Sequence, residues 1–193
     1  MSMRHHRYFE IEEQVLPFRA KQLEAWKKGN KSIAPPYFVV PPIVRNQPAY
    51  HFAETLALRR YYDREGWQGF SSYALGAQYP NSERRAAGRR KVEEIIPSRR
   101  LARLRSVRSA MEKTYRGAGE PDLFLFKESG LFKFVEVKKG ADRVGPAQLE
   151  CIAQIRAILR CQVDIVYATD REGYVPKRYR FDLVRYTGER ILQ

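Results

Sequence analysis

The sequence predicts an α/β fold, because helical and strand-like segments alternate along the chain. A helix with one apolar side ends near residue 66, two β-favouring runs follow residue 120, and then come an amphipathic helix and a buried strand. This order is typical of a small mixed sheet flanked by helices. The 193 residues suffice for a domain with a substantial core, and a hydrophobic content of 44% excludes a chain that is disordered throughout.

The chain is strongly basic, with 36 Lys and Arg against 22 Asp and Glu and a formal net charge of +14. Such a charge favours a polyanionic partner, nucleic acid first, then an anionic membrane or an acidic protein. No apolar run is long enough to span a membrane, and residues 1–14 lack the apolar region of a secretory signal. We therefore expect a cytoplasmic protein with no membrane partner.

Cysteine and histidine are scarce, with two and three copies in the whole chain. This inventory excludes a zinc finger and a thiolate cluster. A metal ion in this protein would therefore be held by carboxylates, which favours a hard ion such as Mg²⁺ or Mn²⁺.

The first third of the chain predicts helices joined by an extended segment. Over residues 8–30, Ile11, Val15 and Phe18 have near-helical spacing, and five prolines between residues 34 and 48 exclude a central strand or a helix. Residues 1–47 are thus predicted to form a helical and proline-rich arm. Pro48 is expected to begin a helix that stops at Gly66, and residues 67–75 are expected to form the first strand.

Residues 81–116 are the most basic segment, with twelve basic and four acidic side chains. Pro97 divides the segment into two predicted helices. Arginine-rich helices are often solvated faces, but four acids cannot pair with twelve bases, so we expect most of this charge to contact DNA phosphates. The residues predicted to bind DNA are Arg84, Arg85, Arg89, Arg90, Lys91, Arg99, Arg100, Arg103, Lys139 and Arg143.

A predicted hairpin carries the ionisable side chains that could take part in catalysis. Strands over 123–126 and 131–138 are joined by a turn, and a three-residue loop that ends in a left-handed Gly130 places Asp122 opposite Glu136. Lys138 then shares their face of the strand. Two carboxylates on directly opposed residues of a hairpin repel each other unless a cation or a proton lies between them. A divalent ion there polarises a phosphate and activates water, and Lys138 stabilises developing charge.

The C-terminal part predicts a helix over 146–160, a buried strand over 162–168 and a half-exposed strand over 178–186. We expect residues 48–168 to form one core that contains the Arg-rich helical stretch, about 81–116, as an insertion. Residues 169–193 are expected to form a C-terminal strand extension.

Three motifs, G-E-P-D at 119–122, E-V-K at 136–138 and G-P-A-Q at 145–148, resemble the VRR-NUC family of PD-(D/E)XK nucleases. The resemblance implies a restriction-endonuclease-like core and a metal-dependent DNA endonuclease that uses Mg²⁺ or Mn²⁺. The family also places a Glu on the helix before the first strand, which is Glu54 here. The catalytic residues it implies are Asp122, Glu136, Lys138, Glu54 and Gln148, and the metal ligands are Asp122, Glu136, the Val137 carbonyl and Glu54.

Several alternatives stay open at this point. Glu54 also suits a surface residue that complements the helix dipole, and Gln148 a residue that bonds the backbone. His51, one turn before Glu54, is more typical of a structural residue than of a ligand. A nucleic-acid-binding module that keeps the fold without catalysis is the alternative, and it ranks well below the nuclease because no residue of the site is missing. A DNA-repair enzyme, a phage-type enzyme and an antibacterial toxin with an acidic immunity protein all remain compatible, as does a homodimer that cuts double-stranded or branched DNA.

Overall fold

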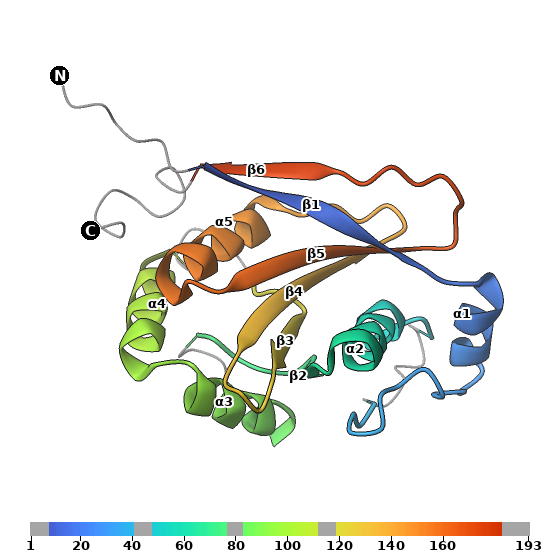
Figure 1. The fold of residues 1–193 in the computed structure, drawn as a ribbon, viewed down its shortest axis with the longest axis horizontal. Helices are drawn as coiled ribbons and strands as arrows, with labels where there is room; N and C mark the ends of the chain where they lie inside the picture. The colour runs from blue at the N-terminus through green and yellow to red at the C-terminus, as the bar shows by residue number, and fades with distance from the viewer. Residues whose placement is uncertain (1–7, 41–47, 77–82, 112–118, 183–193) are drawn as a thin grey trace.

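A computed structural model describes residues 8–40, 48–76, 83–111 and 119–182 (Figure 1). Its elements in chain order are β1 (Tyr8–Pro17), α1 (Ala20–Lys27), α2 (Phe52–Glu65), β2 (Gln68–Phe70), α3 (Glu83–Ile95), α4 (Ser98–Met111), β3 (Leu123–Phe126), β4 (Phe132–Lys139), α5 (Pro146–Gln154), the π-helical turn η1 (Ile155–Leu159), β5 (Gln162–Thr169) and β6 (Arg178–Asp182). Within these ranges, none of the helices has the length and apolar character needed to cross a membrane.

Six strands form one mixed sheet in the order β2-β3-β4-β5-β1-β6. The central strands β4, β5 and β1 are parallel neighbours, whereas β2, β3 and β6 pair antiparallel. Parallel pairing of β4 with β5 needs a crossover connection, which α5 and η1 supply. The expectation of a mixed sheet flanked by helices is confirmed.

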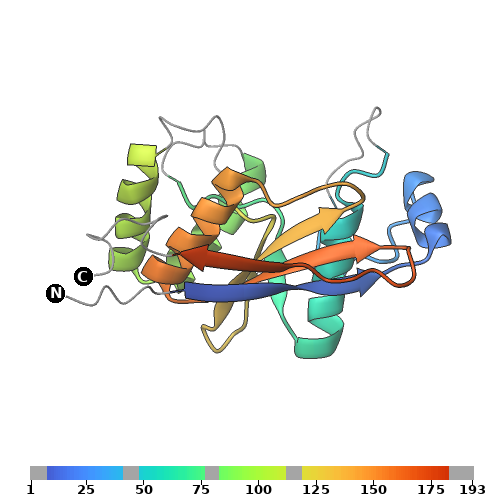
Figure 2. The ribbon, with the colours of Figure 1, turned by 90° about the horizontal axis from the view of Figure 1, so that it is seen from above.

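Helices cover both faces of the sheet, with α1 and α2 lying apart from the group of α3, α4 and α5 (Figure 1, Figure 2). Strand side chains alternate between faces, so Phe124 and Phe134 pack in the core under α3, α4 and α5. Leu125 and Val135 pack in the second core, with α2 and Trp26 of α1. Asp122 and Glu136 have the same parity as the phenylalanines and therefore belong to the first face.

The hairpin has the predicted register. Phe124 lies opposite Phe134 and Phe126 opposite Phe132, which continues to Asp122 opposite Glu136. Gly130 has a φ of 82°, a left-handed conformation that glycine adopts without steric cost. The loop chemistry thus sets which side chains share a face.

The predicted helices around Pro97 and after Pro146 are also confirmed. α3 and α4 flank Pro97, and α5 begins at Pro146 and continues into η1. Gly66 ends α2 in a left-handed conformation with a φ of 69°, as expected for a C-terminal stop.

The helix expected over residues 8–30 is wrong for residues 8–17, which form β1, and correct for α1. Ile11 and Val15 are four residues apart, and that spacing keeps two side chains on one side of a strand as well as of a helix. β1 is selected by pairing with β5 and β6, more than 140 residues away along the chain. No local pattern contains that information.

Two further boundaries differ from the expectation. The helix begins at Phe52 and not at Pro48, because His51 has a left-handed φ of 60° that interrupts helical geometry. The strand expected over 67–75 is limited to β2, since residues 71–76 leave the sheet and contact α3 and α4. The last strand ends at Asp182 in the described part, and positions 183–186, like 41–47, 81–82 and 112–116 of other predicted segments, lie outside it.

Candidate active site

The end of the β3–β4 hairpin brings Asp122 and Glu136 together. Asp122 lies directly before β3, and its Oδ2 accepts a hydrogen bond from the Val137 backbone N–H at 2.8 Å. The Glu136 side chain is fully buried on β4, with Oε1 2.6 Å from Nζ of Lys138. The Gln148 amide donates a hydrogen bond to the same Oε1. Four of the five predicted catalytic side chains therefore converge at one end of the hairpin.

Burial makes both hairpin carboxyls difficult to ionise. Burial raises the pKa of Asp122 to about 6, against the hydrogen bond from Val137, and the nearby charge of Glu54 raises it further. Burial raises the pKa of Glu136 to about 8, and the charge of Asp122 adds to this effect while Lys138 opposes it. Ionising both carboxyls without a nearby cation therefore costs free energy. This property is expected of a pair that binds a metal ion or holds a proton.

Gln148 sits in the first turn of α5 with two roles for its amide. Its Oε1 accepts the Gly145 backbone N–H at 2.9 Å, and its Nε2 bonds Glu136. The capping contact fixes the amide, so the donor points at the carboxylate. Its catalytic role stays a prediction, but its position beside Glu136 is clear.

Gly119 holds α5 against the segment that leads into β3. It has a φ of 55°, and a Cβ there would lie 2.4 Å from the Ala147 carbonyl oxygen and 2.9 Å from the Gln148 nitrogen. Gly130 has a similarly left-handed φ, but a Cβ there would meet no atom within 4 Å. Alanine substitutions at these two glycines therefore distinguish the cost of backbone strain from the cost of steric overlap.

We therefore expect Gly119→Ala to destabilise the protein by about 2–4 kcal/mol, because conformational strain and overpacking add. Gly130→Ala should cost about 1–2 kcal/mol from strain alone. Urea unfolding of both variants measures the difference. Equal losses would mean that α5 shifts away freely and that Gly119 does not position Gln148.

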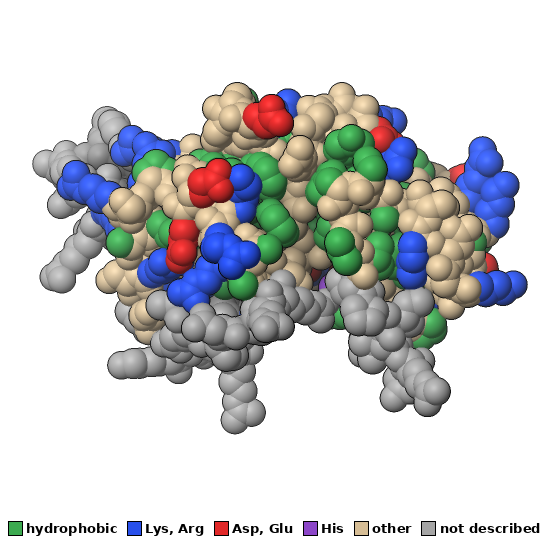
Figure 3. Space-filling model, turned by 90° about the horizontal axis from the view of Figure 1, so that it is seen from below, with side chains coloured by type: hydrophobic (Ala, Val, Ile, Leu, Met, Phe, Trp, Pro, Cys, Tyr) green, Lys and Arg blue, Asp and Glu red, His purple; other side chains and the backbone are tan. Residues whose placement is uncertain are grey.

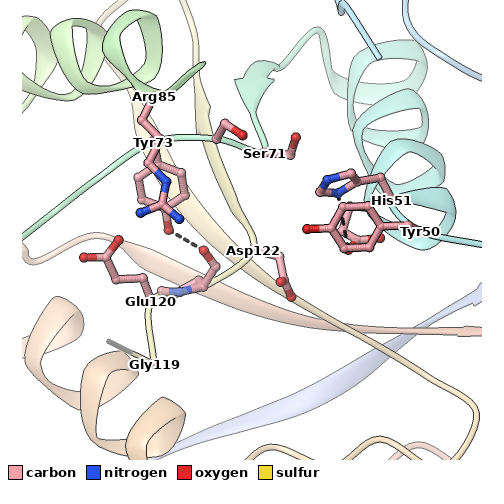
Figure 4. A pocket seen from close by; sticks show the side chains of 11 residues that line it. Tyr50, His51, Ser71, Tyr73, Arg85, Gly119, Glu120 and Asp122 are labelled. Carbon is pink, nitrogen blue, oxygen red and sulfur yellow. Dashed lines mark hydrogen bonds and ion pairs between the residues drawn. The ribbon is translucent and has the colours of Figure 1, made fainter. Parts of the chain in front are cut away.

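Glu54 reaches the site from the first turn of α2. It lines a pocket of about 370 Å³ together with Asp122, His51 and Tyr50 (Figure 4). His51 Nδ1 is 3.7 Å from Glu54 Oε1. Burial acts to raise the pKa of Glu54, but the nearby His51 imidazole, the backbone of Glu54 itself and the charge of Lys139 outweigh burial, so its pKa is lowered. Glu54 is therefore an ionised carboxylate that faces the same pocket as Asp122.

The donor set fits a divalent cation. Glu136 Oε2 and Glu54 Oε2 are both buried, and neither has a hydrogen-bond partner among the described residues. Carboxylate oxygens left unsatisfied in this way suit a hard ion such as Mg²⁺ or Mn²⁺. Across the described ranges, no three acidic, histidine or cysteine side chains are close enough together to hold one ion directly. A metal role for Glu54 stays a prediction, with a bridging water as its route.

The basic residues predicted to bind DNA fall into three groups. Arg85 lines the pocket, and Lys139 bonds the Ala49 carbonyl at 3.3 Å, close to the site. Arg89 and Lys91 pair with acids on their own helix, at 3.4 Å from Glu93 and 2.8 Å from Glu94. The third group lies away from the pocket and is exposed: Arg90, Arg99, Arg100, Arg103 and Arg143. Of these, Arg100 donates a hydrogen bond to the Leu159 carbonyl. The side chain of Arg84 lies outside the described part.

On the face shown in Figure 3, Lys and Arg side chains lie at both ends, with a few acidic side chains among them. In α3 and α4, Glu93 contacts both Arg89 and Arg105, and Glu94 contacts Lys91. Acidic partners thus neutralise only part of the positive charge of these two helices. DNA contact by this surface stays a prediction.

Two lining residues were not singled out from the sequence. Glu120 Oε1 accepts the backbone N–H groups of Leu75 and Gly76 at 3.2 and 3.0 Å, and Tyr73 donates its hydroxyl hydrogen to the Pro121 carbonyl. Both contacts join the segment after β2 to the residues directly before Asp122. The sequence signal for Glu120 is its position two residues before Asp122, whereas Tyr73 lies 49 residues earlier and has no such signal.

This arrangement, with acidic residues at a hairpin end and a lysine and glutamine beside them, is the one expected of a nuclease. The family model for the VRR-NUC domain matches residues 62–170, more than half of the chain. The protein therefore belongs to the VRR-NUC family, a nuclease family of the PD-(D/E)XK superfamily. Membership implies a hydrolase that acts on nucleic acid, with DNA as its substrate.

The matched range includes Asp122, Glu136, Lys138 and Gln148, and α3 and α4 lie within its limits. Glu54 lies outside the matched residues. Among curated proteins, none matches the chain.

Proposed function

We propose that this protein is a DNA endonuclease that depends on Mg²⁺ or Mn²⁺, with Asp122 and Glu136 at its catalytic centre. The observation that carries the proposal is the buried Glu136 carboxylate, whose Oε1 is bonded by Lys138 and Gln148 while Oε2 has no hydrogen-bond partner in the described part of the chain. Asp122, Glu136 and the Val137 carbonyl are the proposed ligands, with Glu54 acting through water. A bound divalent ion supplies charge to the phosphate and an acidified water as nucleophile.

The residues around the ion have distinct proposed tasks. Hydrolysis joins a water oxygen to phosphorus while the bond to one ester oxygen breaks, so negative charge grows on the phosphate oxygens. Lys138 supplies a fixed positive charge beside them. Gln148 and Lys138 together hold the Glu136 carboxylate in one orientation.

We further propose that residues 48–168 form the PD-(D/E)XK core, with α3 and α4 as a basic insertion that binds the DNA backbone. Exposed arginines on these helices contact phosphates without reading sequence. β1 and β6 then extend the sheet at the edge opposite to β2. The DNA structure that the protein cuts best would distinguish a repair role from a phage-type or toxin role.

The test is cleavage of supercoiled plasmid, linear duplex, flap and four-way junction DNA by the full chain in Mg²⁺, Mn²⁺ or EDTA. We expect cutting in Mg²⁺ or Mn²⁺ and none in EDTA. Preference for flap or junction would favour repair or recombination, and equal cutting of all duplexes would favour a toxin or phage enzyme. Salt-sensitive binding without cutting in either metal would contradict the proposal and favour a non-catalytic binding module.

A further inference from the structure

One arginine of the basic helices faces the catalytic pocket. Arg85 lies near the start of α3 and lines the pocket that Asp122 and Glu54 also line. In Figure 4 its guanidinium projects from α3 toward Glu120, across the pocket from Tyr50 and His51. The pocket thus has an α3 wall with a cation and an α2 wall with an aromatic pair, and Asp122 lies between them.

The backbone of α3 is held tightly at this place. Gly88, one turn after Arg85, approaches so closely that a Cβ would lie 2.3 Å from the Ser72 carbonyl oxygen and 2.9 Å from the Tyr73 Cβ. Glycine inside a helix costs about 1 kcal/mol relative to alanine, so this position is expensive unless the close contact offsets it. The contact joins α3 to two residues that themselves line the pocket.

The partner segment is fixed from its other sides as well. Arg105 of α4 donates to the Leu75 carbonyl at 3.0 Å, and Glu120 accepts the backbone N–H groups of Leu75 and Gly76. α3, which carries Arg85, therefore packs against residues 72–73, and the same segment is hydrogen-bonded through Leu75 and Gly76 to Glu120, two residues before Asp122. Such a support gives a side chain a defined position before substrate arrives.

The charges of the pocket favour a cation on this wall. Asp122 and Glu54 present carboxylates to the pocket, and Glu120 lies close by, so a phosphodiester that enters meets repulsion. The guanidinium of Arg85 is near Glu120, whose pKa is raised by burial and lowered in part by the charges of Arg108 and Arg85. Guanidinium binds two phosphate oxygens at once, which fixes the phosphate as well as attracting it.

We propose that Arg85 binds the phosphodiester under attack and stabilises its growing charge, which makes α3 part of the active site and not only a DNA clamp. The inference rests on the proposed endonuclease function and adds a specific group to it. In this arrangement the two non-bridging phosphate oxygens contact Arg85 on the α3 wall, and Asp122, which lines the same pocket, lies on the other side of the phosphorus.

The test compares Arg85→Ala, Arg85→Lys and Arg64→Ala in the full chain. Arg64 is an exposed arginine in the last turn of α2, about 15 Å along the helix from Glu54, so its variant loses the same charge away from the pocket. Single-turnover rates are measured at saturating DNA in Mn²⁺, and Kd is measured with Ca²⁺ in place of Mn²⁺. Thermal unfolding verifies that each variant folds.

We expect Arg85→Ala to lower the saturated rate about 10²-fold, as for removal of one oxyanion donor, while its Kd changes no more than that of Arg64→Ala. Arg85→Lys should recover part of the rate, because it restores the charge without the two-point contact. A saturated wild-type rate with weakened Kd in Arg85→Ala would overturn the inference and leave Arg85 as a clamp residue. Failure of the wild-type protein to cut would instead overturn the endonuclease proposal itself.

Discussion

Asp122→Asn is expected to lower the rate of DNA cleavage by about 10²–10³-fold or more, the loss typical of a group that stabilises transition-state charge. The asparagine carbonyl can still accept the Val137 N–H that Asp122 accepts at 2.8 Å. The hairpin therefore keeps its geometry, and only the negative charge that would hold the cation is removed. DNA affinity should stay the same or improve, because one carboxylate no longer repels phosphate.

Gel-based cleavage in Mg²⁺ and Mn²⁺, together with Kd from fluorescence anisotropy, measures both parts of this prediction. The matched control is Asp63→Asn, which removes an exposed carboxylate that pairs with Arg59 at 2.6 Å near the end of α2. That variant should cut at the wild-type rate. An Asp122→Asn protein that cuts as fast as this control would mean that the catalytic centre lies elsewhere.

The β3–β4 hairpin was predictable because its geometry is local. A three-residue loop with a left-handed glycine determines the register, and the register determines that Asp122 meets Glu136 and that Lys138 shares their face. The helix after Pro146 follows from equally local signals. These parts of the site depend on fewer than thirty consecutive residues.

β1 was mispredicted for the opposite reason. Its place between β5 and β6 depends on partners far along the chain, and a spacing of four residues fits helix and strand alike. Glu13 shows the same dependence: it is buried in β1 because Tyr174 and Tyr179 donate hydrogen bonds to its carboxylate at 2.6 and 2.9 Å. A lone Glu in a polar stretch gives no sign of such distant partners.

The walls of the pocket were predictable only in part. Glu54 and Arg85 were named from sequence, but their meeting with Asp122 depends on a tertiary arrangement of α2, α3 and the hairpin. His51 has a left-handed backbone although it is not glycine, a conformation that costs free energy and often marks functional sites. Sequence alone cannot indicate that conformation.

The metal-free protein is expected to lose stability as the pH rises, and this loss should depend on Asp122. Its pKa is raised from an ordinary 3.8 to about 6, and that of Glu136 from 4.5 to about 8, in both cases chiefly by burial. A carboxyl whose pKa is raised on folding binds its proton more tightly in the folded state. Its contribution is therefore fully present below the unfolded pKa and is lost as the pH rises through the folded pKa.

The window for this loss runs from about pH 4 to about pH 8, and the shift of Asp122 alone corresponds to about 3 kcal/mol at 1.36 kcal/mol per pKa unit. In EDTA, we expect the unfolding temperature of the wild-type protein to fall across this window by roughly 10 °C more than that of Asp122→Asn. The asparagine variant should thus be the more stable protein at pH 8. Asp63→Asn should follow the wild-type curve.

Divalent metal should reverse the effect, because an ion that binds only the folded protein with both carboxyls ionised offsets their repulsion. Unfolding curves at pH 8 in Mg²⁺ or Mn²⁺ should show the wild-type protein stabilised relative to EDTA and Asp122→Asn nearly unchanged. Stabilisation of both proteins to the same extent would place the ion away from Asp122. Parallel pH curves for the two proteins in EDTA would mean that Asp122 is hydrated in solution, and its carboxyl would then ionise without cost.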